Sequence, residues 1–316
     1  MPIAVERSAG RVLVDVVLLV VAVPFAGLVL LRLAGIDGNR HTAAALALTP
    51  YAAVAGLVLS GLAMALRRWW VGAPVLLLAV VLVLVVLPRA VPAGRPDPGG
   101  PELRVLSANL FLGRADPRRV VELVREHDVD VLVLLEAHAA AVRGLTEAGL
   151  FTLLPERVHR AGSALLSRYP LTELALAEPS TLGQPSARVR LPGGTAVEVV
   201  AVHSRPPVEA FDTWRAELGR LPAADPDGPP RILAGDFNAT LDHAALRRVL
   251  AGGYRDAGAE RGKGLMPTWP GRWFPPPVTI DHVLVDSRVA VREYRVRPLP
   301  GGDHDAVYAR LALPAG

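Results

Sequence analysis

Carboxylate, amide and imidazole side chains recur in this sequence at the points where apolar, strand-like runs end. Asp236 and Asn238 follow the run ILAG with a spacing of two residues. Because side chains alternate along an extended chain, both would leave the strand on the same face and point at a common target. The competing interpretation is a simple turn built by the Asp and Asn side chains.

Glu136 and Asn109 follow apolar runs in the same way. Glu136 comes directly after VLVLL, where a carboxylate is costly unless a cation or hydrogen-bond donors surround it. A bound metal ion would be such a partner. Alternatively, Glu136 is a first-turn acid of an exposed helix over AHAAAVRGL. Asn109, after RVLSA, carries the weakest signal when it is taken alone.

Two histidines and two further aspartates occupy similar places. His203 ends the alternating run AVEVVAVH, although a lone histidine there is more often a surface or satisfied residue. Asp281 precedes a strand in TIDHVLVD, where a buried carboxylate usually has an imidazole or a cation beside it. Asp303 and His304 follow two glycines in GGDHDAV, a pattern that also fits a solvated turn.

Taken together, these side chains form a set rich in oxygen ligands and poor in soft ones. Such a set suits Mg²⁺ or Mn²⁺ and a phosphate. The chain has no cysteine, which excludes disulfides, zinc-thiolate sites, iron-sulfur clusters and cysteine nucleophiles.

The elements that would position these residues lie in the last two thirds of the chain. Residues 102–316 contain many short apolar runs of strand length and a few helical segments, such as PRRVVELVREH after the N-cap candidate Asp116. This mixture predicts a layered α/β or α+β domain, of which α+β is preferred. Residues 88–101 hold five prolines and three glycines, which predicts an extended linker.

The first 87 residues are predicted to be a membrane anchor. Three apolar stretches, residues 12–33, 43–66 and 71–87, are about long enough to cross a bilayer as helices. A signal peptide is the alternative for the first stretch, but the stretch is long and lacks a clear small-residue cleavage site. The bilayer is therefore an expected partner.

Charge placement bears on orientation and on substrate class. The first 100 residues carry eight arginines and four acidic residues, whereas the rest of the chain is balanced. The arginines divide evenly between the two sides of the membrane, but the Arg67–Arg68 pair in a very short turn favours an inside N-terminus. Three crossings then predict an extracytoplasmic C-terminal domain. Its balanced charge does not favour nucleic acid as a partner.

The strand-end residues resemble those of the endonuclease/exonuclease/phosphatase superfamily, the DNase I-like group. The resemblance covers about residues 102–313, and its segments occur in the family's order: RVLSANL, DVLVLLE, SALLSRYPL, VVAVHSRPP, ILAGDFNAT, PTWP, TIDHVLV and GGDHDAV. It implies a two-sheet, four-layer α/β sandwich with an active site at one edge. It also implies a metal-dependent phosphohydrolase.

The resemblance assigns roles residue by residue. Glu136 matches the main metal carboxylate, Asn109 a metal or phosphate contact, and Asp303 an additional acid on the metal side. Asp236 and Asn238 match the pair that handles the attacking water and a phosphate oxygen. His203 resembles the imidazole near the phosphate or leaving group, and Asp281 the carboxylate that orients His304. Whether Asp236 or His304 takes the proton from water stays open.

Four positions depart from the family pattern, and they affect substrate contacts more than catalysis. Leu135 stands where the family often has Gln, Val202 where it often has Asn, and Gly302 and Ala306 flank the last motif in place of Ser and Pro. The membrane anchor followed by this domain resembles a bacterial subset linked to teicoplanin resistance. That resemblance implies a lipid-linked phosphate as the substrate.

Three functions are weighed. The leading hypothesis is a membrane-anchored, Mg²⁺-dependent phosphoesterase, with Asn238, His203 and Arg168 as substrate contacts. The first alternative is an extracellular nuclease with the same chemistry, in which Arg168 would join Arg188, Arg190 and Arg205 in a basic patch. The second is a catalytically silent membrane module, which the complete set of chemical residues disfavours. Protein partners and oligomeric state are not indicated by the sequence.

Overall fold

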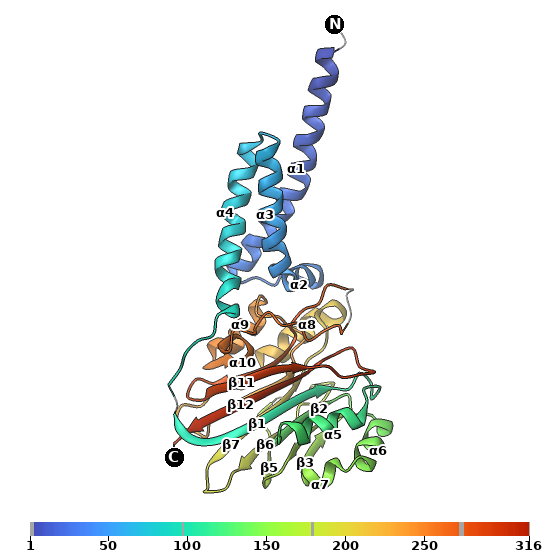
Figure 1. Cartoon of the computed structure of the whole chain (residues 1–316), viewed down its shortest axis with the longest axis vertical. Helices are drawn as coiled ribbons and strands as arrows, with labels where there is room; N and C mark the ends of the chain where they lie inside the picture. The colour runs from blue at the N-terminus through green and yellow to red at the C-terminus, as the bar shows by residue number, and fades with distance from the viewer. Residues whose placement is uncertain (1–2, 97, 178–179, 272–274, 316) are drawn as a thin grey trace. The chain divides into compact units, whose positions relative to one another are not determined.

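The computed structural model describes residues 3–96, 98–177, 180–271 and 275–315 (Figure 1). The chain divides into two compact units. The first comprises residues 1–88 together with Asp242–Ala244, and the second comprises residues 89–241 and 245–316. The division falls at the start of the predicted linker.

The first unit is helical. Its elements are α1 (Ile3–Ala34), α2 (Arg40–Ala47), α3 (Thr49–Ala65) and α4 (Trp69–Val86). Two helical segments, Ala9–Ala34 and Trp69–Ala90, are long and apolar enough to cross a membrane. Large apolar side chains such as Val20, Val58 and Leu84 are more than 60% exposed in this unit. Exposed apolar surface of this kind is typical of contact with lipid.

Of the three stretches predicted to cross the membrane, the first and the third form single helices long and apolar enough to do so. The second predicted stretch, residues 43–66, is not one helix, because α2 and α3 meet at a bend of 73°. Pro50, near the start of α3, explains the break. Proline has no backbone N–H and its ring collides with the carbonyl four residues earlier, so a helix does not continue through it. The two helices make a third span only if the bent pair crosses together.

Asp15, the acidic residue of the first apolar stretch, has a partner within this unit. Its carboxylate accepts a hydrogen bond from Nε of Arg68, which lies in the turn between α3 and α4. Leu18, Ala63 and Val75 pack together in a small apolar cluster. Arg68, one of the two arginines that bear on orientation, therefore also pairs with the acid of α1.

The second unit contains two six-stranded sheets. The first sheet has the order β11-β12-β1-β2-β4-β3 and the second the order β5-β6-β7-β8-β10-β9. The strands of the first sheet are β1 (Gly99–Asn109), β2 (Val131–Leu135), β3 (Glu156–Arg160), β4 (Ser163–Ser167), β11 (Ala290–Arg297) and β12 (Ala306–Pro314). Those of the second are β5 (Leu171–Leu174), β6 (Ser186–Arg190), β7 (Ala196–His203), β8 (Arg231–Asp236), β9 (Tyr254–Asp256) and β10 (Asp281–Asp286).

The two sheets pack face to face, and helices cover their outer faces. The largest apolar cluster joins side chains of both sheets, among them Val105, Val133, Val199 and Ile232. The other face of the first sheet packs against α5 (Pro117–Glu126), α6 (Ala139–Glu147) and α7 (Leu150–Leu153). The other face of the second packs against α8 (Pro207–Gly219) and α9 (Ala244–Ala251), while α10 (Ala257–Glu260) lies beside β10 and β11. The unit is therefore a four-layer sandwich.

Local sequence signals explain these elements well where they are strong. Asp116 caps α5 by accepting a hydrogen bond from the backbone N–H of Arg118 at 2.9 Å. Val120, Val121 and Val124 of that helix are buried against the first sheet. The helix predicted from the apolar spacing after Asp116 is thus present, and its apolar face is the one that the pattern indicates.

Most of the predicted linker is attached to the second unit. The backbone N–H of Ala93 donates to the carbonyl of Glu260 at 3.0 Å, and Nε of Arg95 pairs with the Glu260 carboxylate at 3.1 Å. Pro92 forms an isolated bridge with Arg261, and β1 begins at Gly99. Part of the proline-rich segment is therefore part of the folded domain, because its carbonyls and N–H groups find partners there.

Candidate active site

The topology brings strand ends from both sheets to one edge. The parallel pairs β1–β2 and β7–β8 end together, with Asn109 opposite Leu135 and His203 opposite Asp236. In the antiparallel pair β8–β10, Asp281 lies opposite Asp236. The start of β12 lies beside the end of β1, which brings the loop carrying His304 to the same edge. Eight candidate residues thus come from the ends of six strands in two sheets.

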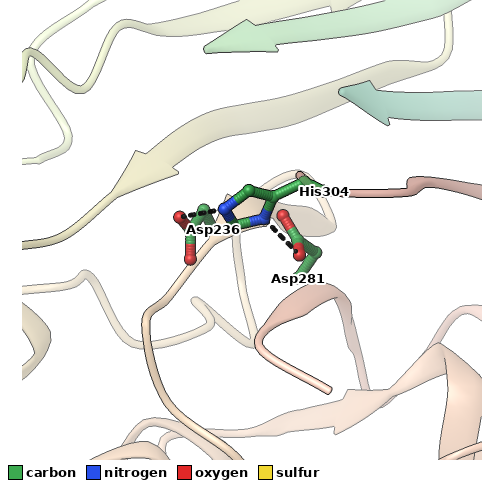
Figure 2. A group of neighbouring side chains, drawn as sticks. All are labelled: Asp236, Asp281 and His304. Carbon is green, nitrogen blue, oxygen red and sulfur yellow. Dashed lines mark hydrogen bonds and ion pairs between the residues drawn. The ribbon is translucent and has the colours of Figure 1, made fainter. Parts of the chain in front are cut away.

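Asp281, His304 and Asp236 form a chain of contacts, shown in Figure 2, in which the imidazole lies between the two carboxylates. Nδ1 of His304 donates to Oδ2 of Asp281 at 2.9 Å, and Nε2 lies 3.8 Å from Oδ2 of Asp236. All three residues are buried. Burial by itself lowers the pKa of His304, but the negative charges of Asp281 and Asp236 outweigh it and raise that pKa to about 10.

Asp236 is held by the turn that follows β8. Its Oδ1 accepts a hydrogen bond from the backbone N–H of Asn238 at 2.8 Å, and its Oδ2 accepts one from Asn238 Nδ2 at 3.1 Å. Asn238 has a φ of 46°, in the left-handed region that asparagine tolerates better than most residues. Burial raises the pKa of Asp236 to about 7, although the charge of His304 opposes this shift.

Glu136 and Asn109 continue the group on the first-sheet side. Asn109 Nδ2 lies 3.2 Å from Oε1 of Glu136 and 3.3 Å from Oδ2 of Asp236, so it donates to both carboxylates. Its Oδ1 accepts from the N–H of Phe111, which fixes the orientation of the amide. Oε2 of Glu136 accepts from the N–H of Leu112 at 2.7 Å. Asn109 therefore connects the two carboxylates that the sequence analysis places in different roles.

His203 lies at the end of β7, beside Glu136. Its Nε2 is 3.6 Å from Oε1 of Glu136, and the side chain is buried. Burial lowers the pKa of His203 to about 4, against the opposing attraction of Glu136. At neutral pH this imidazole is uncharged, whereas that of His304 is charged. The two histidines of the site therefore differ in what they offer a substrate.

The oxygens at this edge fit a hard divalent cation. Within the described residues, Oδ1 of Asp303 is buried without a hydrogen-bond partner, while its Oδ2 accepts from Trp269 Nε1 at 3.3 Å. Asp236, Asp281 and His304 offer three ligand atoms within 4.8 Å of one another. Because Asp281 and His304 bond each other directly, we interpret them as an orienting pair. The site has more carboxylate oxygens than hydrogen-bond donors, and Mg²⁺ or Mn²⁺ would bind the oxygens that are left.

Arg168 is not brought to this edge. It follows β4, and Ser167 lies opposite Val131 at the start of β2, whereas Glu136 follows the other end of that strand. Its guanidinium pairs with Asp128 at 2.6 Å and donates to the carbonyl of Val129. The reason is the antiparallel pairing of β2 and β4, which sends their carboxyl ends to opposite edges of the sheet.

Three further residues support the site and were not assigned from the sequence. The hydroxyl of Ser204 and Nε1 of Trp214 both donate to the carbonyl of Phe237, which lies between Asp236 and Asn238. The hydroxyl of Thr268 accepts from the backbone N–H of Asp281 at 3.1 Å. Ser204 lies in the motif VVAVHSRPP and Thr268 in the motif PTWP, so the sequence did point to these two segments. The hydrogen bonds that the two residues make are revealed only by the fold.

The fold and the composition of this edge define a DNase I-like α/β domain. Residues 106–304 match the model of the endonuclease/exonuclease/phosphatase family. The chain belongs to this family, whose members include metal-dependent phosphoesterases. The family resemblance inferred from the motifs is thereby confirmed, and membership of the membrane-anchored bacterial subset stays a prediction.

Several solved structures share the fold at low sequence identity. An endonuclease/exonuclease/phosphatase from Beutenbergia cavernae is 21% identical, with a TM-score of 0.51 over 68% of this chain and 72% of that one. A humanized D. rerio TDP2 is 16% identical, with a TM-score of 0.52 over 66% and 98% of the two chains. A family protein from Bacteroides vulgatus is 17% identical, with a TM-score of 0.50 over 67% and 99%. No curated protein matches the chain.

Proposed function

We propose that this protein is a membrane-anchored, Mg²⁺-dependent phosphoesterase that hydrolyses lipid-linked phosphate substrates outside the cytoplasmic membrane. The observation that carries the chemical part is the buried Asp281–His304–Asp236 chain beside Glu136 and Asn109. These groups can position a water molecule, hold a proton and contact a phosphate at one edge of the sandwich.

Each residue of the site has a distinct task in this proposal. Asp236 directs the attacking water and accepts its proton, since its pKa of about 7 lies near the working pH. His304, held by Asp281, presents a positive imidazole to a phosphoryl oxygen. Asn238 and the neutral His203 contact the phosphate or leaving group. Glu136, Asn109 and Asp303 would hold Mg²⁺ or Mn²⁺, which when bound neutralises developing charge on the phosphoryl group.

A lipid substrate is supported by features outside the catalytic edge. Two helical segments suit membrane crossing, and their apolar side chains are widely exposed. Tethering an active site to a bilayer raises its effective concentration toward lipid phosphates. The rest of the chain has balanced charge, which does not favour a polyanion such as nucleic acid.

The test is an assay panel with the full-length protein in detergent micelles. Wild type should release phosphate from a polyprenyl diphosphate or a phospholipid with Mg²⁺ and lose this activity with a chelator. His304→Ala and Glu136→Gln should lower kcat/KM by about 100-fold or more. His159→Ala, which removes an exposed histidine of β3, is the matched control and should behave as wild type.

Two results would contradict the proposal. Lack of activity on every lipid phosphate in the presence of Mg²⁺ or Mn²⁺ would remove the substrate class. Metal-dependent cleavage of a plasmid or an oligonucleotide that disappears in Glu136→Gln would favour the nuclease alternative instead.

A further inference from the structure

Arg205 stands two residues after His203, and its backbone is tightly held. The N–H of Ser204 donates to the carbonyl of Asp236 at 3.1 Å, and the N–H of Arg205 donates to Oε2 of Glu217 at 2.9 Å. Glu217 is buried on α8 and also accepts from the hydroxyl of Ser180. Pro206 follows with a φ of −63°, and a residue before proline is restricted to extended conformations. The position of Arg205 is thus fixed relative to His203 and Asp236.

The side chain of Arg205 contrasts with this fixed backbone. It is half-buried, and among the residues that the structure describes its guanidinium has no ion-pair or hydrogen-bond partner. Two other arginines of the sandwich that are buried or half-buried do have partners: Arg231 binds Glu198, and Arg288 binds Asp286. Partial burial of a guanidinium without a hydrogen-bond partner costs free energy, because the lost contacts with water are not replaced. A bound ligand that accepts its hydrogen bonds would remove this cost.

We infer the direction of the Arg205 side chain from the alternation of side chains along an extended segment. Successive side chains of an extended segment leave on opposite sides, so residues 203 and 205 leave on the same side. Between them, the hydroxyl of Ser204 turns away to the carbonyl of Phe237. His203 contacts Glu136 on that side. For an anion bound beside the neutral His203, the guanidinium of Arg205 would therefore be the nearest positive charge along the chain.

We propose that Arg205 binds a second phosphate group of the substrate, so that the enzyme prefers a diphosphate ester to a monophosphate ester. A guanidinium recognises a phosphate with two parallel hydrogen bonds, which suits the phosphate group of a diphosphate that water does not attack. A diphosphate needs one additional cation of this kind. A nucleic acid would need a basic track, and the balanced charge after residue 100 does not provide an excess of positive charge.

This inference rests on the proposed phosphoesterase function, and the experiment separates the two. The full-length protein in detergent is assayed on a polyprenyl diphosphate and on the matching monophosphate. Arg205→Gln should raise KM for the diphosphate by about 10- to 100-fold and change KM for the monophosphate much less. Arg205→Lys should recover only part of the loss, since an ammonium lacks the planar fork. Arg220→Gln is the matched control, because Arg220 is exposed at the end of α8.

Binding of inorganic pyrophosphate and of inorganic phosphate, measured by calorimetry with the same variants, decides the inference without turnover. Wild type should bind pyrophosphate at least about tenfold more tightly than Arg205→Gln does, with phosphate affinity little changed. Equal pyrophosphate affinity in the two proteins would overturn the role of Arg205. Inactive wild type with Arg205-dependent pyrophosphate binding would contradict the proposed reaction but support the anion site. Equal losses on both substrates would overturn the preference for a diphosphate.

Discussion

The carboxyl of Asp236 and the imidazole of His304 share one buried environment but are shifted for different reasons. Burial raises the pKa of Asp236 to about 7, and two neighbouring carboxylates raise that of His304 to about 10. Between pH 5 and 8, His304 stays protonated in the metal-free protein while Asp236 titrates. Of the two candidates for the base, Asp236 is thus the one able to gain a proton in this range.

A pH profile tests this assignment. An ionised Asp236 is needed to accept the proton of water, so kcat/KM should rise with pH up to about 7 at low Mg²⁺ and then level off. A bound cation stabilises the carboxylate, so the midpoint should move to lower pH as Mg²⁺ increases. Initial rates on bis(p-nitrophenyl) phosphate measure it. A midpoint that does not respond to Mg²⁺ would contradict a metal held by Glu136 and Asn109, since Asn109 contacts Asp236.

In the proposed mechanism, Asp281 acts through His304. Asp281→Asn removes the charge that holds His304 as a cation and weakens the bond at Nδ1. We expect kcat to fall by about 100-fold or more with little change in KM, and the pKa of His304, followed by NMR, to fall as well. Asp212→Asn, an exposed change on α8, should leave both unaffected. An unchanged pKa of His304 together with a low kcat would indicate a merely structural defect.

Among the elements, the connection between β7 and β8 supports the turn that follows β8 and holds Asp236 and Asn238. The carbonyl of Phe237 receives hydrogen bonds from Ser204, directly after β7, and from Trp214 on α8. These bonds fix the backbone between Asp236 and Asn238, where Asn238 has the left-handed conformation. Strain of this kind persists at a site only when its surroundings hold it.

Ser204→Ala and Trp214→Phe each remove one of the two donors. Each change should lower the free energy of unfolding by about 1 kcal/mol and lower kcat more than it changes KM. Because both act on one acceptor, the double variant should be non-additive, with a loss larger than the sum. Urea denaturation and steady-state kinetics measure these effects. Simple additivity in kcat would mean that the two donors do not position the turn together.

Much of this architecture follows from local sequence signals, and the remainder depends on pairing between distant segments. Strand ends, the α5 cap and the apolar helices could be predicted because periodicity and capping are local. That Glu136, Asp236 and His304 lie close together was inferred from the order of the motifs. The strand pairing explains it, because it brings the ends of the strands that carry them to one edge. The place of Arg168 could not be inferred, because it depends on the antiparallel pairing of β2 with β4. The contacts of Ser204 and Trp214 likewise need the β7–β8 register.

For the whole chain, the central prediction concerns the side of the membrane on which the sandwich lies. An inside N-terminus and three crossings, with α2 and α3 crossing as a bent pair, would put the catalytic unit outside. Protease added to intact spheroplasts should then remove residues after Pro88. Treatment of broken spheroplasts is the control for protease access. Protection in intact spheroplasts with digestion in broken ones would mean that the sandwich is cytoplasmic. Two crossings with an inside N-terminus would produce that arrangement.

The attachment of Ala93 and Arg95 to Glu260 has a consequence for enzyme kinetics at a surface. If all fourteen linker residues were free, they could extend to roughly 45 Å. Because Pro92, Ala93 and Arg95 are attached to the domain, only a few residues of the linker are free to extend. We therefore expect the proposed phosphoesterase to act on molecules that diffuse to it within the plane of the lipid, rather than on those at a distance.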